Sequence, residues 1–454
     1  MGSGLRILIP LIILILSCLI PSAGYVNAIV SNGTKIIDPH LQIESLFKGI
    51  SNPTSMAFLG NDDILVLEKN EGTVKRIVNG TMIVEPLLDV NVATKGSRGM
   101  LGIAIPKHTN GSKNYVFLYY TEAATKDGED VSEGKDPLGN RLYRYELGNN
   151  LLINPKLILD LPASPGSIHN GGKILIGPDN NVYLVLGDLV DFKNSTQGHN
   201  YTQAQNVHNG SFPNGSGGIL RIAQDGSSIQ GVIGNKPPLS EYYAYGIRNS
   251  FGMDFDPLSE KLWDTENGPA YGDEINLVQP GFNSGWNKVQ GIWAPRGNNS
   301  GEVVLSPRDL VTFDGKGKYG APKFVWYNNV APTALKFFNS DKLGSEYEND
   351  MFVGDYINGQ LYHFDLNQNR TGLNLHGPLV DGVANKSDEL KSIVFGRGLG
   401  RITDIQVGPD GYLYLLIYHS IHGSIVKISP VNAQTSTSYK VLPSPLNENT
   451  TEVD

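Results

Sequence analysis

Residues 174–186 read ILIGPDNNVYLVL, and residues 405–417 read IQVGPDGYLYLLI. Each stretch is a short apolar run, a Gly-Pro-Asp turn and an alternating β-rich run, which is the pattern of two antiparallel strands joined by a tight turn. Looser copies of this unit lie at 56–66 and 253–263. A strand–turn–strand unit that recurs along a chain predicts a β-propeller, in which each unit contributes to one blade.

The predicted fold is all-β: a six-bladed β-propeller of antiparallel four-stranded sheets over residues 40–430. No stretch shows the sustained 3.6-residue period of an amphipathic helix. Two stacked β-sandwiches are the alternative all-β arrangement. The blades are expected near residues 49–88, 98–160, 169–225, 244–288, 322–368 and 400–430.

Composition narrows the class of protein. The 454 residues include 53 glycines and 26 prolines, and 40% are hydrophobic, which excludes a disordered chain and a helical bundle. The net charge is −9, from 36 Lys and Arg against 45 Asp and Glu, so we expect no nucleic-acid partner. The single cysteine, Cys18, excludes a disulfide within the chain and a cysteine-ligated metal cluster.

The two ends of the chain differ from its body. Residues 1–28 combine Arg6 with an apolar run and small residues at 22–24, which predicts a secretory signal peptide or an uncleaved N-terminal membrane anchor. Residues 431–454 predict a disordered tail rich in Ser, Thr, Asn and Pro. Glycosylation sequons predict an extracytoplasmic protein, secreted or anchored at the cell surface; they begin at Asn32, Asn79, Asn110, Asn194, Asn200, Asn209, Asn214, Asn298, Asn369, Asn385 and Asn449.

The first candidate for chemistry is a histidine in a glycine-rich turn. His169 lies beside Gly171 and Gly172, just before a β-rich run, and Asp188 ends the next run. Strand–turn–strand geometry brings the two close together, and a carboxylate on one imidazole nitrogen fixes the tautomer and raises the basicity of the ring. The alternative is a loop histidine with a structural hydrogen bond to an aspartate.

Arginines in two further turns are candidates for anion binding. Arg248 and Asn249 lie in the run 246–250, GIRNS, where a guanidinium offers a fixed fork to an oxyanion or a carbonyl. Arg397 and Arg401 flank a glycine-rich stretch that could hold an anionic ligand. An arginine that only locks a turn is the alternative for Arg248, and a glycine-rich run without a strand–helix context is weak support for a nucleotide site.

Residues 266–276 read ENGPAYGDEIN. Carboxylates, an amide and carbonyls exposed by glycine and proline lie close together, and hard oxygen ligands on an irregular loop suit Ca²⁺. A solvated acidic turn is the alternative. The ligand spacing differs from that of an EF-hand loop.

Taken together and in this order, these segments resemble the family of glucose/sorbosone dehydrogenases that depend on pyrroloquinoline quinone (PQQ). The resemblance runs from about Gly49 to Pro430. It implies an oxidoreductase that oxidises aldose sugars at C1 to lactones by hydride transfer to PQQ and passes the electrons to an external acceptor. The motifs that carry it are GMLGIA (99–104), HNGG (169–172), GD (187–188), GIRNS (246–250), ENGP (266–269), DEIN (273–276), RITD (401–404) and GPDG (408–411).

The resemblance also implies catalytic roles. His169 is the general base for the anomeric hydroxyl, with Asp188 orienting it. Arg248 and Asn249 polarise the quinone oxygens and stabilise developing negative charge. Arg401 faces a carboxylate of PQQ.

Calcium is the second cofactor that the resemblance implies. The carbonyls of Gly268 and Pro269 hold the Ca²⁺ that bridges to PQQ. Asp273 and Glu274 belong to a neighbouring structural calcium loop.

Two cationic positions of the family are absent here. Ile357 stands where a lysine is expected, and Thr403 replaces the second arginine of the last-blade pair. Arg397 and Arg98 are possible replacement cations. Trp326 is assigned to the cofactor site as a sugar-stacking residue, and a core tryptophan is the alternative.

Two other functions remain open on the sequence. One is a non-catalytic calcium-binding propeller ectodomain that serves as a binding module. The other is a calcium-dependent hydrolase of the lactonase type. No pattern in the sequence predicts an oligomeric state.

Overall fold

The computed structural model describes residues 33–107, 114–128, 137–190, 201–294, 302–303, 309–420 and 422–431. The predicted signal segment (1–28), Cys18 and the tail from 432 onward lie outside these residues. The described fold is all-β, and its helices are single 3₁₀ segments: η3 (Gln203–Gln205), η4 (Ser345–Tyr347), η5 (Gly377–Leu379) and η6 (Ser387–Ser392). None of the helices in the described ranges has the length and apolarity needed to cross a bilayer.

The strands form a series of twisted sheets: the first two consist of consecutive strands, and the third adds two later strands to four consecutive ones. The first contains β3 (Pro53–Gly60), β4 (Asp63–Glu68), β5 (Thr73–Val78), β6 (Thr81–Met82) and β7 (Leu88–Asp89). The second contains β8 (Met100–Ala104), β9 (Tyr115–Glu122), β10 (Gly139–Gly148) and β11 (Leu151–Leu161). The third contains β12 (Ile174–Ile176), β13 (Val182–Leu186), β14 (Gly218–Ile222), β15 (Tyr242–Tyr245), β19 (Phe282–Asn283) and β22 (Lys318–Tyr319).

The remaining sheets take strands from distant parts of the chain. The fourth contains β16 (Ser250–Phe255), β17 (Leu262–Glu266), β18 (Tyr271–Val278), β23 (Phe324–Asn328) and β27 (Val383–Ala384). The fifth contains β24 (Pro332–Phe338), β25 (Asp350–Asp355), β26 (Leu361–Phe364), β28 (Val394–Arg397) and β1 (Lys35–Ile36). The sixth contains β29 (Arg401–Val407), β30 (Leu413–Tyr418), β31 (Gly423–Pro430) and β2 (Leu41–Ile50), and a separate pair joins β20 (Trp293–Ala294) to β21 (Glu302–Val303).

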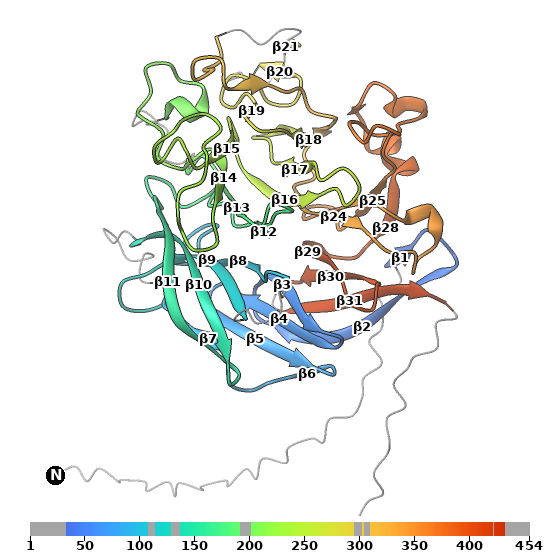
Figure 1. The fold of residues 1–454 in the computed structure, drawn as a ribbon. Helices are drawn as coiled ribbons and strands as arrows, with labels where there is room; N and C mark the ends of the chain where they lie inside the picture. Colours follow the sequence, from blue (N-terminus) through green and yellow to red (C-terminus); the bar gives the residue numbers. More distant parts are fainter. Residues whose placement is uncertain are drawn as a thin grey trace, which may run out of the picture.

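These sheets are arranged as a propeller. The first strand of each sheet contacts the first strand of the next, from β3 to β8, β12, β16, β24 and β29, and β29 contacts β3 again (Figure 1). The first strands therefore surround a central channel, and the outer strands lie at the periphery. We predicted four-stranded sheets, but among the six ring sheets only the second and sixth have four strands, because short additional strands extend the others, including β1 from the N-terminal end.

The repeated Gly-Pro-Asp turns close strand pairs in the same way. At the first turn, Gly177 donates its N–H to the carbonyl of Asn181 at 2.8 Å, and the Tyr183 hydroxyl donates to Asp179 Oδ2 at 3.0 Å. At the second turn, Tyr414 donates to Asp410 Oδ2 at 2.7 Å. The aspartate thus links each turn to the strand that follows, which explains why the motif recurs in the sequence.

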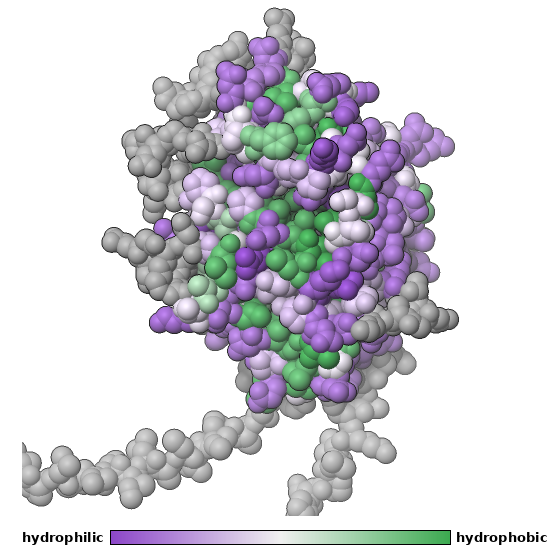
Figure 2. Space-filling view, turned by 60° about the vertical axis from the view of Figure 1, so that its left-hand side comes forward, coloured by the Kyte–Doolittle hydropathy of each residue, from purple (hydrophilic) through white to green (hydrophobic). Residues whose placement is uncertain are grey.

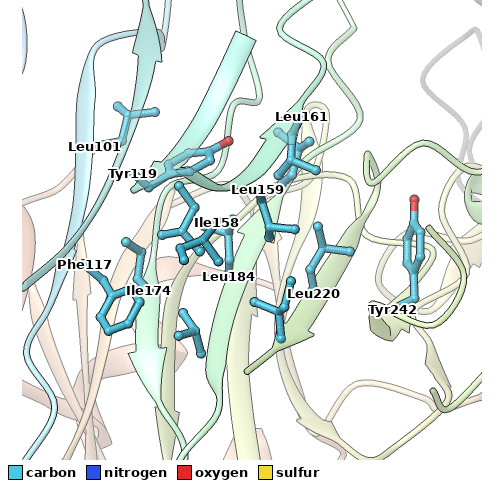
Figure 3. Packing of buried hydrophobic residues seen from close by; sticks show 14 of the residues in the cluster. Leu101, Phe117, Tyr119, Ile158, Leu159, Leu161, Ile174, Leu184, Leu220 and Tyr242 are labelled. Carbon is cyan, nitrogen blue, oxygen red and sulfur yellow. The ribbon is translucent and has the colours of Figure 1, made fainter. Parts of the chain in front are cut away.

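The core lies between the faces of neighbouring sheets. Figure 3 shows side chains of β8 and β9 meeting those of β12, β13 and β14, with Phe117, Tyr119, Leu184 and Leu220 fully or almost fully buried. Each such side chain stabilises the fold by about 1.5–3 kcal/mol through burial. Figure 2 shows one outer face, where hydrophobic surface gathers near the middle among hydrophilic side chains.

Candidate functional site

A cavity of about 480 Å³ lies on the central channel. Its wall includes residues in or next to the first strand of every sheet in the ring, for example Thr54, Leu101, Phe251, Thr333 and Thr403. The cavity therefore lies on the axis of the ring, and loops from all sides contribute to it. Its wall also contains five residues predicted to be functional: His169, Arg248, Asn249, Gly268 and Asp273.

The predicted contact between His169 and Asp188 is present. His169 Nδ1 lies 2.6 Å from Asp188 Oδ1, and the two side chains are 10% and 0% exposed. The other carboxylate oxygen of Asp188 accepts a hydrogen bond from Trp286 Nε1 at 2.8 Å. With Asp188 ionised, the proton of the neutral ring lies on Nδ1, so Nε2 is the basic nitrogen.

Gly187 lies where three site segments meet. A Cβ atom at this position would lie 2.5 Å from the His169 carbonyl oxygen, 2.7 Å from the Arg248 carbonyl oxygen and 2.9 Å from Asn249 Oδ1. The next residue, Asp188, donates its N–H to the same Arg248 carbonyl at 2.9 Å. The absence of a side chain at Gly187 therefore allows the histidine segment and the arginine segment to approach each other closely.

Arg248 is buried in the wall of the cavity. Its guanidinium donates from Nη1 to the Asn267 carbonyl at 2.7 Å and lies 5.4 Å from the centre of the Trp286 ring. Burial lowers the pKa of Arg248, while the carboxylates of Asp188 and Glu266 oppose that change. Since the ordinary pKa of arginine lies far above neutrality, the side chain remains a cation.

Two buried carboxamides on the cavity wall have unsatisfied atoms. Asn249 Oδ1, and both Oδ1 and Nδ2 of Asn267, have no hydrogen-bond partner among the described residues. Buried polar atoms are normally hydrogen-bonded, so these atoms indicate the position of a polar ligand.

The predicted calcium loop forms a network of hydrogen bonds. Asp273 accepts N–H groups from Gly268, Val330 and Ala331 at 2.7, 2.7 and 2.8 Å. The carbonyl of Gly268 accepts Nδ2 of Asn329 at 3.0 Å. Asp273 therefore ties the loop before β18 to the loop before β24 and fixes the Gly268 carbonyl at the cavity.

Glu274 points into a different, fully buried environment. Its carboxylate accepts hydrogen bonds from Gln290 Nε2 at 3.0 Å and Asn276 Nδ2 at 3.0 Å. Pro269, the other predicted metal residue, is half-buried and does not line the cavity. The described residues contain no group of three or more His, Cys, Asp or Glu side chains arranged to hold a metal ion.

Carboxyl groups around the cavity are costly to ionise. Burial raises the pKa of Asp273 to about 6 and that of Glu266 to about 7. Asp264 and Glu274 are also fully buried, and burial together with the nearby Glu266 charge raises their pKa values well above the ordinary range. The fourth sheet therefore concentrates buried carboxyl groups, and their ionised forms would need a nearby cation for charge balance.

This concentration of acids predicts an unusual pH dependence. A raised pKa in the folded state means that the native protein binds more protons than the unfolded chain, so stability falls as pH rises. For Asp273 the loss runs from its ordinary pKa up to about 6, and for Glu266 up to about 7. The melting temperature of the protein, measured in buffer that contains a metal chelator, should fall as the pH rises from 5 to 8. Glu266→Gln should flatten the upper part of this decline, and an equal slope in the variant would contradict the assignment.

Three predicted cofactor residues are not part of the cavity wall that the described residues form. Trp326 is 1% exposed and packs in the core against Phe324 and Tyr362, so its assignment to the cofactor site is wrong and the core alternative describes it. Arg401 and Arg397 are exposed, and neither belongs to the cavity wall formed by the described residues. The Arg401 guanidinium lies over the rings of Tyr356 and Tyr418, which both line the cavity, at 5.1 and 5.6 Å from their centres.

Arg98, named as a replacement cation, does not line the cavity either. It is buried, and its Nη2 donates to the carbonyls of Ala163 and Gly166. The cationic side chains that the sequence reasoning missed are Lys69 and Lys173, both in the wall. Lys173 follows directly after the His169 motif, and that adjacency was the available signal.

The fold and the cavity define a class: a β-propeller with a ligand site on its central channel, built around a buried His–Asp pair and a buried arginine. The family model described as Glucose / Sorbosone dehydrogenase matches residues 50–427, and the chain belongs to this family.

Relatives with known names agree with this assignment. Aldose sugar dehydrogenase YliI of Escherichia coli is 25% identical over 402 residues, covering 86% of this chain and 94% of that protein. Quinoprotein glucose dehydrogenase B of Acinetobacter calcoaceticus is 28% identical over 298 residues, covering 61% of this chain and 59% of that protein. The apo structure of the E. coli aldose sugar dehydrogenase has a TM-score of 0.65 at 23% identity, covering 86% of this chain and 99% of that chain, and supports the fold.

Proposed function

We propose that this protein is an extracytoplasmic quinoprotein that oxidises aldose sugars at C1 to lactones, with His169 as general base. The observation that carries the proposal is the hydrogen bond of 2.6 Å between His169 Nδ1 and Asp188 Oδ1 at the wall of the cavity. An oriented imidazole whose other nitrogen is basic suits proton removal from a sugar hydroxyl.

The residues of the cavity fit PQQ. Its quinone and pyrrole groups need hydrogen-bonding partners, which the unsatisfied carboxamide atoms of Asn249 and Asn267 and the guanidinium of Arg248 supply. Its carboxylates need cations, and Lys69 and Lys173 lie in the same wall. When bound, PQQ supplies the quinone that accepts a hydride from C1 of the sugar.

The chain's own residues would then manage protons and charge. His169 Nε2 accepts the proton of the C1 hydroxyl, while Asp188 stabilises the imidazolium that results. Arg248 is a fixed donor that stabilises negative charge developing in the cavity, and its burial strengthens that effect because water does not compete. Repeated sugar oxidation would also need an external electron acceptor.

Calcium would bind near the Gly268 carbonyl. This oxygen and the unsatisfied Oδ1 of Asn267 are hard, neutral ligands of the kind that Ca²⁺ accepts. Asp273 holds the Gly268 loop in place through its three backbone hydrogen bonds, and we propose that it acts by that route. Pro269 and Glu274 stay predictions as calcium residues.

Reconstitution is the direct test. Purified protein given Ca²⁺ and PQQ should reduce a redox dye in the presence of an aldose, with turnover on the order of 1–1,000 s⁻¹. Omission of PQQ should abolish the reaction. If PQQ neither binds nor supports turnover, a calcium-binding ectodomain becomes the better proposal; lactone hydrolysis with Ca²⁺ alone would favour a hydrolase.

The location and the blade count belong to the same proposal. Every sequon asparagine in the described residues is exposed, which suits glycosylation in an extracytoplasmic compartment; these are Asn79, Asn209, Asn214, Asn369 and Asn385. We also propose that the ring β3–β8–β12–β16–β24–β29 corresponds to six blades, since each of these strands begins a separate sheet.

A further inference from the structure

Lys173 and Asp404 form an ion pair across the central channel. Lys173 Nζ lies 2.7 Å from Asp404 Oδ1. Lys173 directly precedes β12, and Asp404 lies in β29. In the ring of first strands, two strands separate β12 from β29 on either side, so the pair joins opposite sides of the channel.

Asp404 is fixed by further contacts. Its Oδ2 accepts hydrogen bonds from the Ser55 hydroxyl and the Met56 N–H, both at 2.9 Å. These residues belong to β3, so the carboxylate joins the first, third and sixth sheets. The position of the Lys173 ammonium is therefore set by parts of the chain that are far apart in sequence.

The Lys173 ammonium lies at the cavity and has more N–H donors than its contact with Asp404 uses. An ammonium carries three N–H donors, and Asp404 Oδ1 is the hydrogen-bond partner that the described residues provide. The Lys173 side chain is 9% exposed, so bulk water is largely excluded, and the residue lines the cavity wall. A buried cation with unused donors favours an anionic ligand.

We propose that Lys173 binds a carboxylate of the ligand in this cavity, and that Asp404 positions it across the channel. The inference rests on the proposed function, in which the carboxylate belongs to PQQ. It assigns the anion contact to the third sheet, because the exposed arginines Arg397 and Arg401 lie outside the cavity wall. A carboxylate on the sugar would use the same chemistry, and the test separates the two sources.

The test measures PQQ binding without turnover. In calcium-loaded protein without sugar, Lys173→Met should raise the dissociation constant for PQQ by about 10- to 100-fold, as expected for loss of one charge-assisted hydrogen bond. Quenching of tryptophan fluorescence or calorimetry gives the constant. Asp404→Ala removes the acceptor that positions the lysine, so it should lower the melting temperature and weaken PQQ binding by about three- to tenfold, less than Lys173→Met does.

A matched control separates the effect of losing a paired lysine from the effect on ligand binding. Lys336 Nζ pairs with Asp254 Oδ2 at 3.1 Å between β24 and β16, and neither residue lines the cavity. Lys336→Met should lower the melting temperature without weakening the binding of PQQ. If Lys173→Met alone folds poorly, the double variant Lys173→Met with Asp404→Asn removes both charges and should still bind PQQ weakly.

The remaining outcomes show whether the bound carboxylate belongs to PQQ or to the sugar, and which results would overturn the proposal. Unchanged PQQ affinity with a raised KM for glucuronate, and not for glucose, would place the contact on a sugar carboxylate. Unchanged values for all three ligands would overturn the inference. If wild-type protein binds no PQQ, the proposed function fails separately. Thermal stabilisation by benzene-1,3,5-tricarboxylate then tests Lys173, and equal stabilisation of wild type and Lys173→Met would overturn it.

Discussion

His169→Asn should lower kcat about 100- to 10,000-fold, the range that a positioned general base contributes. Asparagine is the replacement of choice because His169 has a φ of 63°, and asparagine adopts this left-handed conformation more readily than other non-glycine residues. The variant should retain PQQ binding and a near-native melting temperature, since the change removes the base without displacing the turn. Dye reduction in the reconstituted enzyme measures the effect.

A second histidine provides the matched control. His363 Nε2 lies 2.8 Å from Asp350 Oδ2, in the fifth sheet, and neither residue lines the cavity. His363→Asn therefore removes a similar hydrogen bond and should leave kcat unchanged. Turnover of His169→Asn within about threefold of wild type would show that another group removes the proton.

Gly187→Ala should have the second largest effect. The added methyl group would meet the carbonyls of His169 and Arg248, and backbone atoms have little freedom to move away. Overpacking of this kind costs about 1–3 kcal/mol, and for a domain of this size we expect the melting temperature to fall by about 1–4 °C. Because a 1 Å misplacement of catalytic groups can cost about 100-fold, kcat/KM should fall at least tenfold.

Gly177→Ala is the control for the steric effect alone. A Cβ atom there would lie 2.5 Å from the Tyr183 ring, in the same sheet but outside the cavity wall. It should lower the melting temperature by a similar amount and leave kcat/KM unchanged. A Gly187→Ala enzyme with wild-type kcat/KM would show that the two segments tolerate separation.

The sequence predicts local features better than distant ones. The repeated Gly-Pro-Asp turns and the closeness of His169 and Asp188 follow from strand–turn–strand geometry, and the structure has both. The membership of the last sheet was missed, because its outer strand β2 comes from the opposite end of the chain. No periodicity within residues 400–430 indicates that partner.

Side-chain direction was the main source of error at the site. Trp326 lies in a strand with apolar neighbours on both sides, and the sequence alone does not distinguish the core face from the cavity face. Arg401 stays a prediction as a carboxylate contact: its guanidinium lies over Tyr418, its partner on the neighbouring strand β30, and over Tyr356, and both rings line the cavity. Lys173 was overlooked because its partner, Asp404, lies 231 residues away.

The pairing of β2 with β31 also determines when the molecule can finish folding. In the part of the chain that the structure describes, the strand that pairs with residues 41–50 lies at 423–430, so a growing chain lacks this pairing until almost all of it has been synthesised. Contacts of such long sequence separation form slowly, and unpaired strand edges invite aggregation meanwhile. If the chain is threaded through a membrane during synthesis, the ring would close on the far side, and truncation before Gly423 would leave it permanently open.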